Sequence, residues 1–167
     1  MAYVGTGRIL SGDYTTEFYK YDVGTNTWTA IANFPGPARR GSIAFALEGK
    51  GYVGPGQTQA GVSKDFYQYD PALDNWSTVA QLPGAARTSA VAFELNDKGY
   101  VGTGGSSTWG NSLNDFWEYT PSTNSWIQKA NVGTTPRMEA AGFSVYGKGF
   151  IGTGDDQSSG TNYNDFW

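Results

Sequence analysis

Short segments in which aromatic and aliphatic residues alternate with polar residues run along the whole chain, and glycine-rich turns separate them. Segments of about four to eight residues with this alternation are typical of β-strands. The alternation is clearest in residues 18–22, 66–70 and 116–120, where aromatic side chains fall on both faces of the expected strand. A strand that is apolar on both faces has to be covered on both sides, so we expect small sheets that stack against one another.

The pattern repeats, and four markers define its period. An aromatic residue followed by spaced glycines opens a segment at Tyr3, Tyr52, Tyr100 and Phe150, with spacings of 49, 48 and 50 residues. Three further markers keep the same register: acidic–Phe–aromatic triplets starting at Glu17, Asp65, Asp115 and Asp165, the tryptophans Trp28, Trp76 and Trp126, and the arginines Arg39, Arg87 and Arg137. A fixed period indicates one structural unit for each repeat, so residues at equivalent positions are interpreted together.

Each repeat contains four expected strands, which we letter A to D in chain order. Strand A (42–47, 89–95 and 139–145) is rich in small residues, strand B holds the glycine marker, strand C holds the aromatic triplet, and strand D starts near the tryptophan. The A–B turns contain the Gly and Asn that tight hairpins need, and Pro71 and Pro121 fall in the C–D turns. The order predicts an antiparallel meander with strand A in the most crowded place.

These residues resemble the kelch motif: a glycine pair closing strand B, an aromatic-Tyr-Asp-Pro segment such as residues 67–71, and one spaced tryptophan. The resemblance covers essentially the whole chain and implies an all-β fold, a kelch-type β-propeller whose blades are four-stranded antiparallel sheets. In many kelch repeats the two glycines are adjacent, whereas here one residue separates them, as in Gly5 and Gly7. We therefore expect the turn after strand B to differ from that of those repeats.

The strand inventory predicts one propeller unit, residues 1–167, that does not close into a ring. It contains a partial blade B–C–D (1–33), two full blades (38–82 and 86–130) and a partial blade A–B–C (136–167). Known propellers have about four to eight blades, so we expect a missing neighbour. It would be a second copy, with a dimer favoured, or the rest of a longer propeller of which this chain is a fragment. Two copies would supply six complete blades with two B–C hairpins left over, or eight blades of which four have three strands.

Composition narrows the function classes. The net charge is −4 and there is no run of Lys or Arg, which argues against a nucleic-acid or membrane partner. The chain has no Cys and no His, so thiolate nucleophiles, zinc–thiolate sites and the commonest general base are missing. We therefore predict no metal, no cofactor and no catalytic constellation, and favour a binding or assembly module over an enzyme.

The kelch resemblance also implies two enzymatic precedents. Galactose oxidase-like chemistry needs a copper ion held by His and Tyr beside a cross-linked Cys, and this chain has neither His nor Cys. A role similar to that of a sialic-acid mutarotase could use Arg and carboxylates alone. It stays as the weaker alternative, since the sequence locates no acid–base pair.

The candidate ligand face carries the B–C loops and the D–A connections, which emerge on the same side of a meander. The B–C loops (7–17, 56–65, 104–115 and 154–165) vary most in sequence and suit recognition of a protein or glycan. Arg39, Arg87 and Arg137 precede strand A near the expected channel mouth, where they would bind carboxylate, phosphate or acidic sugar. In kelch substrate adaptors, arginines at similar positions bind acidic peptides. The alternative is that each arginine packs on the neighbouring blade and pairs with a local acid such as Glu17, Asp65 or Asp115.

Aromatic residues outside the repeat frame are the other candidates. Trp109, Tyr14 and Tyr163 lie in variable loops, where they would stack on a sugar or anchor a partner, or else fold back over their own blade. Residues 155–160 offer oxygen ligands, but their spacing favours a solvated turn over a calcium loop. The repeated tryptophans Trp28, Trp76 and Trp126 are expected to pack between blades.

Overall fold

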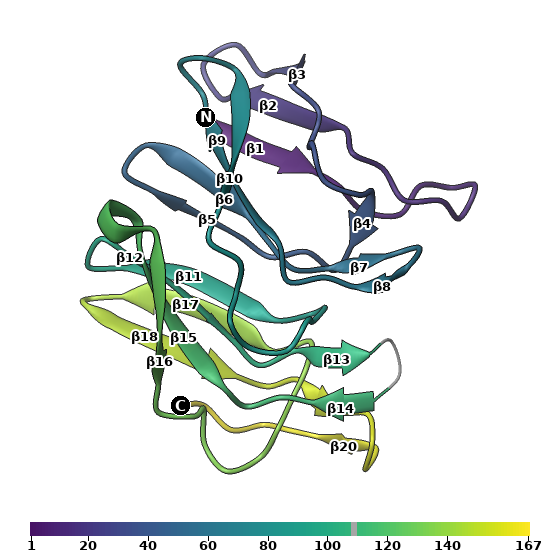
Figure 1. Ribbon diagram of the computed structural model, residues 1–167, viewed down its shortest axis with the longest axis vertical. Coiled ribbons are helices and arrows are strands. Elements are labelled where there is room, and N and C mark those ends of the chain that lie inside the picture. The colour runs from purple at the N-terminus through teal and green to yellow at the C-terminus, as the bar shows by residue number, and fades with distance from the viewer. Residues whose placement is uncertain (108–109) are drawn as a thin grey trace.

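The computed structural model describes residues 1–107 and 110–167 and consists of small antiparallel sheets. The larger sheets follow one another along the long axis of the molecule in sequence order, from the N-terminal sheet at one end to the C-terminal sheet at the other (Figure 1). The chain belongs to the all-β class, as predicted. Within the described residues, the one helical segment is the short 3-10 turn η1 (Pro121–Thr123), and no helix is long and apolar enough to cross a membrane.

The four larger sheets reproduce the predicted meander. Their strands are β1 (Ala2–Gly5), β2 (Phe18–Asp22) and β3 (Thr27–Ile31) in the first sheet; β5 (Ala44–Leu47), β6 (Lys50–Val53), β9 (Phe66–Asp70) and β10 (Asn75–Val79) in the second; β11 (Val91–Leu95), β12 (Lys98–Gly102), β15 (Phe116–Thr120) and β16 (Ser125–Lys129) in the third; and β17 (Ala141–Val145) and β18 (Lys148–Gly152) in the fourth. In each sheet the strands pair in chain order. The expected strand C of the fourth sheet is present only in short form: Phe166 bridges Gly152, and Ile151 and Trp167 exchange backbone hydrogen bonds of 3.0 and 2.8 Å.

The B–C loops form small structures of their own on one side of the larger sheets (Figure 1). In the second loop, β7 (Gln57–Thr58) pairs with β8 (Gly61–Val62), and β4 (Arg39–Arg40) from the preceding D–A connection pairs with β7 to complete a three-stranded sheet. Two further hairpins are β13 (Gly105–Ser107) with β14 (Gly110–Ser112), and β19 (Asp155–Asp156) with β20 (Thr161–Asn162). These hairpins extend the blades on that side.

The strands lettered A in the sequence lie side by side, with β11 packed between β5 and β17. Their aromatic residues press on the next blade at a glycine. A Cβ atom at Gly99 would lie 2.4 Å from the ring of Phe45, and one at Gly149 would lie 2.6 Å from the ring of Phe93. The glycine that opens strand B is thus required by the closeness of the neighbouring sheet.

Two tryptophans join consecutive sheets by the same set of contacts. Trp76 donates its indole N–H to the carbonyl of Ala32 at 2.9 Å, and the Ala32 amide donates to Asp74 Oδ1 at 2.9 Å. Trp126 and Asn124 bond to Ala80 in the same way, at 2.9 and 2.8 Å. We call the sequence Asp/Asn-x-Trp the Asx-x-Trp motif.

The predicted packing between blades is confirmed for Trp76 and Trp126. Trp28 belongs to a third Asx-x-Trp motif, which starts at Asn26. No sheet formed by the described residues covers it, and its side chain is 55% exposed, with its ring against Tyr21.

Candidate functional site

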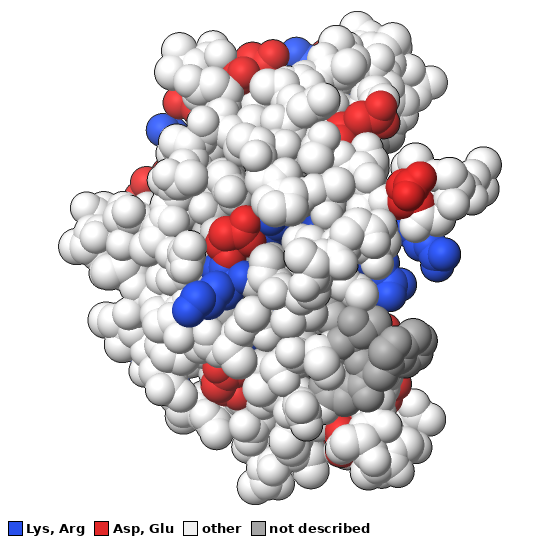
Figure 2. Space-filling view, turned by 45° about the vertical axis from the view of Figure 1, so that its right-hand side comes forward, with Lys and Arg blue, Asp and Glu red and all other residues white. Residues whose placement is uncertain are grey.

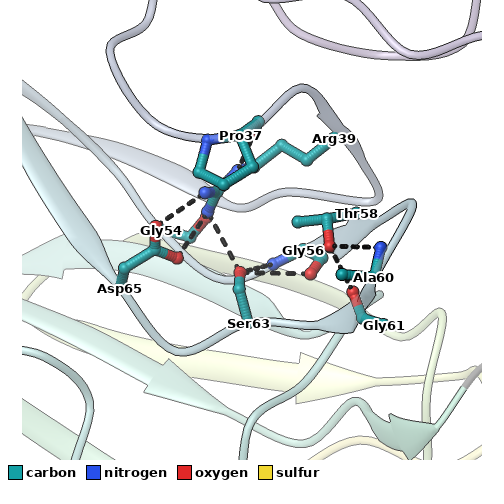
Figure 3. A network of polar contacts seen from close by, with 9 residues as sticks. All are labelled: Pro37, Arg39, Gly54, Gly56, Thr58, Ala60, Gly61, Ser63 and Asp65. Carbon is teal, nitrogen blue, oxygen red and sulfur yellow. Dashed lines mark hydrogen bonds and ion pairs between the residues drawn. The ribbon is translucent and has the colours of Figure 1, made fainter.

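The three repeated arginines are buried in ion pairs. The side chains of Arg39, Arg87 and Arg137 are fully buried, and each meets the aspartate that precedes strand C of its own repeat, namely Asp65, Asp115 and Asp165. Both terminal nitrogens of Arg39 donate to the Asp65 carboxylate, at 2.8 and 2.7 Å (Figure 3). Arg87 makes the same two contacts with Asp115, both at 2.7 Å.

Most of the remaining donors of these guanidinium groups are also used within the protein, whereas the buried Nε of Arg137 has no hydrogen-bond partner among the described residues. Arg39 Nε donates to the carbonyl of Pro37 at 3.0 Å, and its Nη1 also donates to the carbonyl of Gly54 and to Ser63 Oγ (Figure 3). Arg87 bonds likewise to the carbonyls of Ala85 and Thr103. Each arginine therefore ties the start of strand A to the end of strand B and the base of the B–C loop.

The electrostatics follow from this pairing. Burial alone would raise the pKa values of Asp65 and Asp115, but hydrogen bonds and charge from Arg39 and Arg87 outweigh burial and hold both pKa values below their usual range. At Asp165, the hydrogen bonds from Arg137 lower the carboxyl pKa to about 2. The structure thus shows the pairing alternative from the sequence: the arginines sit inside the blades and present no free donor fork to a ligand.

A polar hollow lies beside these arginines, where the residues that follow them meet the loop hairpins. Its volume is about 280 Å³. It is lined by Arg40, Gly41, Thr88, Ser89, Met138 and Glu139 from the three D–A connections, and by Gln57 and Gln157 from two B–C loops. The hollow therefore combines the two parts of the chain that the sequence placed on the candidate ligand face.

The backbone of the hollow is an unusual repeated turn. Gly41, Ser89 and Glu139 occupy equivalent positions, and all three have left-handed backbone angles, with φ of 58°, 52° and 55°. The Ser89 amide donates to the Gly41 carbonyl and the Glu139 amide to the Ser89 carbonyl, both at 3.0 Å. Non-glycine residues hold such angles only when their surroundings fix them, so this line of hydrogen bonds keeps the hollow in shape.

Arg40 differs from the repeated arginines in its contacts and in its charge environment. It is half-buried, donates from Nε to Gln57 Oε1 at 3.0 Å, and holds its guanidinium carbon 5.8 Å from the centre of the Tyr14 ring. Among the described residues no carboxylate lies within ion-pair distance of it. The equivalent residues of the next two repeats are Thr88 and Met138. Sequence reasoning missed Arg40, although its difference from Thr88 and Met138 in one register was the available signal.

The three aromatic residues predicted from the loop sequences lie in different surroundings. Tyr14 lies beside Arg40, next to the hollow, whereas Tyr163 is half-buried and faces the buried Arg137, with 4.5 Å from the guanidinium carbon to its ring centre. Tyr163 therefore folds back over its own blade. Trp109 lies outside the described residues.

The acidic loop that follows strand B of the fourth repeat forms a tight turn. Asp156 accepts hydrogen bonds from the hydroxyls of Ser158 and Ser159, at 2.7 and 2.9 Å. In the part of the chain that the structure describes, no three acidic side chains gather in a way that would hold a metal ion. The expected solvated turn agrees with this geometry.

Comparisons with known proteins identify the repeat. The family model described as the KLHDC2/KLHL20/DRC7 Kelch-repeats domain matches residues 2–146. The solved "Structure of YjhT" has a similar fold, with a TM-score of 0.79 and 21% sequence identity over 92% of this chain and 54% of that chain. This chain thus spans about half the length of the solved structure it matches. A comparison with curated proteins found no match.

Proposed function

Because the chain belongs to the kelch-repeat family, we propose that it is a non-catalytic binding and assembly module whose ligand occupies the polar hollow. The observation that carries this proposal is the position of Arg40. It lines the hollow, and no described carboxylate lies within ion-pair distance of it. Fold alone would not select a function.

Comparison of equivalent positions supports the choice of site. Arg39, Arg87 and Arg137 are identical in three repeats and are consumed by internal ion pairs, which marks them as parts of the scaffold. The very next position changes from Arg40 to Thr88 to Met138, although the backbone around it repeats. Residues that vary on a constant scaffold are suited to shaping a ligand site.

The chemistry of the hollow favours a ligand with a carboxylate. A guanidinium group binds carboxylate with two parallel hydrogen bonds, and the Tyr14 ring beside Arg40 offers an apolar face. The volume of about 280 Å³ suits one acidic sugar residue or one acidic peptide group. On the face drawn in Figure 2, charged side chains lie singly or in small groups, so recognition would depend on local hydrogen bonding rather than on a broad charged surface.

The same geometry favours binding over catalysis. Glu139 carries the single carboxylate among the residues that line the hollow, and Met138 and Gly41 beside it have no titratable side chain. Asp65, Asp115 and Asp165 are held by the arginines. The lining thus offers no second acid or base to pair with Glu139.

Arg40→Ala tests the site, with Arg8→Ala as the matched control. The backbone of Arg8 bridges that of Tyr14, but its side chain is exposed, and among the described residues its one hydrogen bond is to the Gly12 carbonyl of its own loop. Screening of acidic glycans and carboxylate-terminated peptides should identify a ligand whose affinity falls about tenfold or more in Arg40→Ala and stays unchanged in Arg8→Ala. A ligand that binds both variants equally well would place the site elsewhere.

The assembly part of the proposal concerns the two end sheets. Apolar side chains are exposed at both ends of the row: Trp28 at 55% in the first sheet, and Phe143 at 46% and Val145 at 41% in the fourth. Exposed apolar faces and strand edges favour association, so we propose that further propeller strands cover them.

A further inference from the structure

The polar hollow is lined by two neighbouring positions from each of three repeats, which form a grid of six residues. Arg40, Thr88 and Met138 occupy the first position, and Gly41, Ser89 and Glu139 occupy the second. Backbone hydrogen bonds from Ser89 to Gly41 and from Glu139 to Ser89 set the order of the repeats in the grid. The two positions of one repeat are neighbours in the chain. Arg40 and Glu139 are therefore at opposite corners.

These two corners carry opposite charges that do not pair with each other. Among the described residues, no ion pair includes Arg40 or Glu139, so the guanidinium group and the carboxylate are not in contact. The other residues that line the hollow are uncharged. One hollow of about 280 Å³ thus presents a cation and an anion that are separated and unpaired.

The space between the charged corners suits the middle of a ligand that reaches both of them. Each hydrogen-bonded step between neighbouring backbones spans about 5 Å, and two steps separate the repeats of Arg40 and Glu139. Thr88 and Ser89 lie between them, and Met138 offers a thioether chain that packs well against methylene groups. The ligand therefore needs its two charged groups several bonds apart, with an apolar linker between them.

A ligand that carries only carboxylates fits this hollow poorly. When its carboxylate pairs with Arg40, it lies in the same hollow as the Glu139 carboxylate, and the two negative charges repel each other. An ammonium group on the ligand replaces this repulsion by attraction. Since specificity is a difference of affinities, Glu139 discriminates among ligands that Arg40 alone would bind equally well.

We propose that the hollow binds a small zwitterion, whose carboxylate pairs with Arg40 and whose primary ammonium group pairs with Glu139. An ω-amino acid is the simplest member of this class, and the volume of about 280 Å³ accommodates one such molecule. The inference rests on the proposed function, because it keeps Arg40 as the carboxylate site. It adds the second charged group of the ligand and assigns Glu139 as the residue that selects it.

Three small molecules of the same length test this charge pattern. ε-Aminocaproate carries a carboxylate and an amine, caproate lacks the amine, and adipate has a second carboxylate in its place. In NMR titrations of the intact chain, ε-aminocaproate should bind about tenfold or more tightly than caproate, and adipate should bind most weakly. Glu139→Gln should bring the affinity for ε-aminocaproate close to that for caproate.

Charge reversal distinguishes a direct contact from a loss of structure. Glu139→Lys should bind adipate more tightly than ε-aminocaproate, which reverses the order expected for the native chain. Glu48→Gln is the matched control, because Glu48 is also exposed and has a left-handed φ of 52°, but lies in the turn between β5 and β6. This control should leave all three affinities unchanged.

Undetectable binding of ε-aminocaproate, or equal affinities for ε-aminocaproate and caproate, would overturn the zwitterion proposal. An order of affinities that Glu139→Lys does not reverse would also overturn it. If the two molecules bind equally to the native chain but both bind more weakly to Arg40→Ala than to Arg8→Ala, the zwitterion proposal fails and the carboxylate site at Arg40 stands. If both bind and Arg40→Ala changes neither affinity, both proposals fail.

Discussion

At the scale of single residues, the buried arginine–aspartate pairs fix the base of each B–C loop. Removing the Asp115 carboxylate leaves the charge of Arg87 unpaired and out of reach of water, because the side chain of Arg87 is fully buried. Asp115→Asn should therefore lower the free energy of unfolding by about 3–5 kcal/mol, measured by urea titration. Lys50→Ala is the control, since its pair with Asp70 is open to solvent and its loss should leave the midpoint nearly unchanged. Equal effects of the two variants would contradict this account.

The same pairs predict an acid-labile fold. Arg39, Arg87 and Arg137 lower the pKa values of their aspartates, to about 2 for Asp165, below the value of about 3.9 for an unfolded chain. Protons therefore bind the unfolded state more readily, so the stabilisation is complete above the unfolded pKa and is lost as the pH falls from about 4 toward about 2. Urea midpoints measured between pH 7 and pH 3 should show this loss, with a shallower decline in Asp115→Asn.

Two glycines in equivalent positions should respond differently to the same methyl group. A Cβ atom at Gly99 meets the Phe45 ring at 2.4 Å, whereas at Gly51 the nearest atom is 3.7 Å away, because no strand A precedes the second sheet. Gly99→Ala should cost about 1–3 kcal/mol of stability through overpacking. Gly51→Ala should be neutral or slightly stabilising in thermal melts. A large loss in Gly51→Ala would show that another strand already covers that position.

How far the sequence predicts the site is illustrated by Arg39 and Arg40. The repeat located Arg39 and named Asp65 as a possible partner, but only the folded chain brings the start of strand A to the base of strand C. The repeat did not identify Arg40, because it marks positions that are identical in each unit and Arg40 is replaced by other residues in the next two. Whether a side chain is satisfied or free depends on contacts across many residues, which periodicity does not encode.

At the scale of elements, the Asx-x-Trp motif joins one sheet to the next. Trp126→Ala removes both the packing on Phe66 and the hydrogen bond to Ala80, and should cost about 3 kcal/mol, the lower end for a tryptophan because the side chain is only partly buried. Trp28→Ala removes an equivalent residue that is 55% exposed and should cost much less in the same urea titration. Similar losses would show that Trp28 is buried against another chain in solution.

The elements themselves follow from the sequence with few exceptions. Alternation and turn residues placed the strands of the four larger sheets, since each depends on neighbours close in the chain. The pairing of β4 with β7 was not expected, because it joins Arg39 to Thr58 through loop residues without an apolar pattern. The last strand C is reduced to a bridge at Phe166, where the expected alternation has too few residues to form a ladder.

At the scale of the whole molecule, the first and the fourth sheet form two different ends of the row. The fourth sheet leaves Phe143 exposed, and the first leaves Trp28 exposed. The kelch fold was predictable because many weak markers agree in register. The hollow around Arg40 was not predictable, since it combines two positions from each of three repeats with Gln57 and Gln157 from two loops.

The line of hydrogen bonds from Gly41 through Ser89 to Glu139 couples each sheet only to its immediate neighbours. Stability in such a row is approximately a sum of nearest-neighbour terms, so the chain should open from its ends and not all at once. Native-state hydrogen exchange should show the slowest amides in β11 and β12, which have a sheet on either side, and much faster exchange in β1 and β2. Uniform protection would mean that the row behaves as one cooperative block. With a graded profile, binding at either end would stabilise the adjacent sheet most, and this stabilisation would decrease from sheet to sheet along the row.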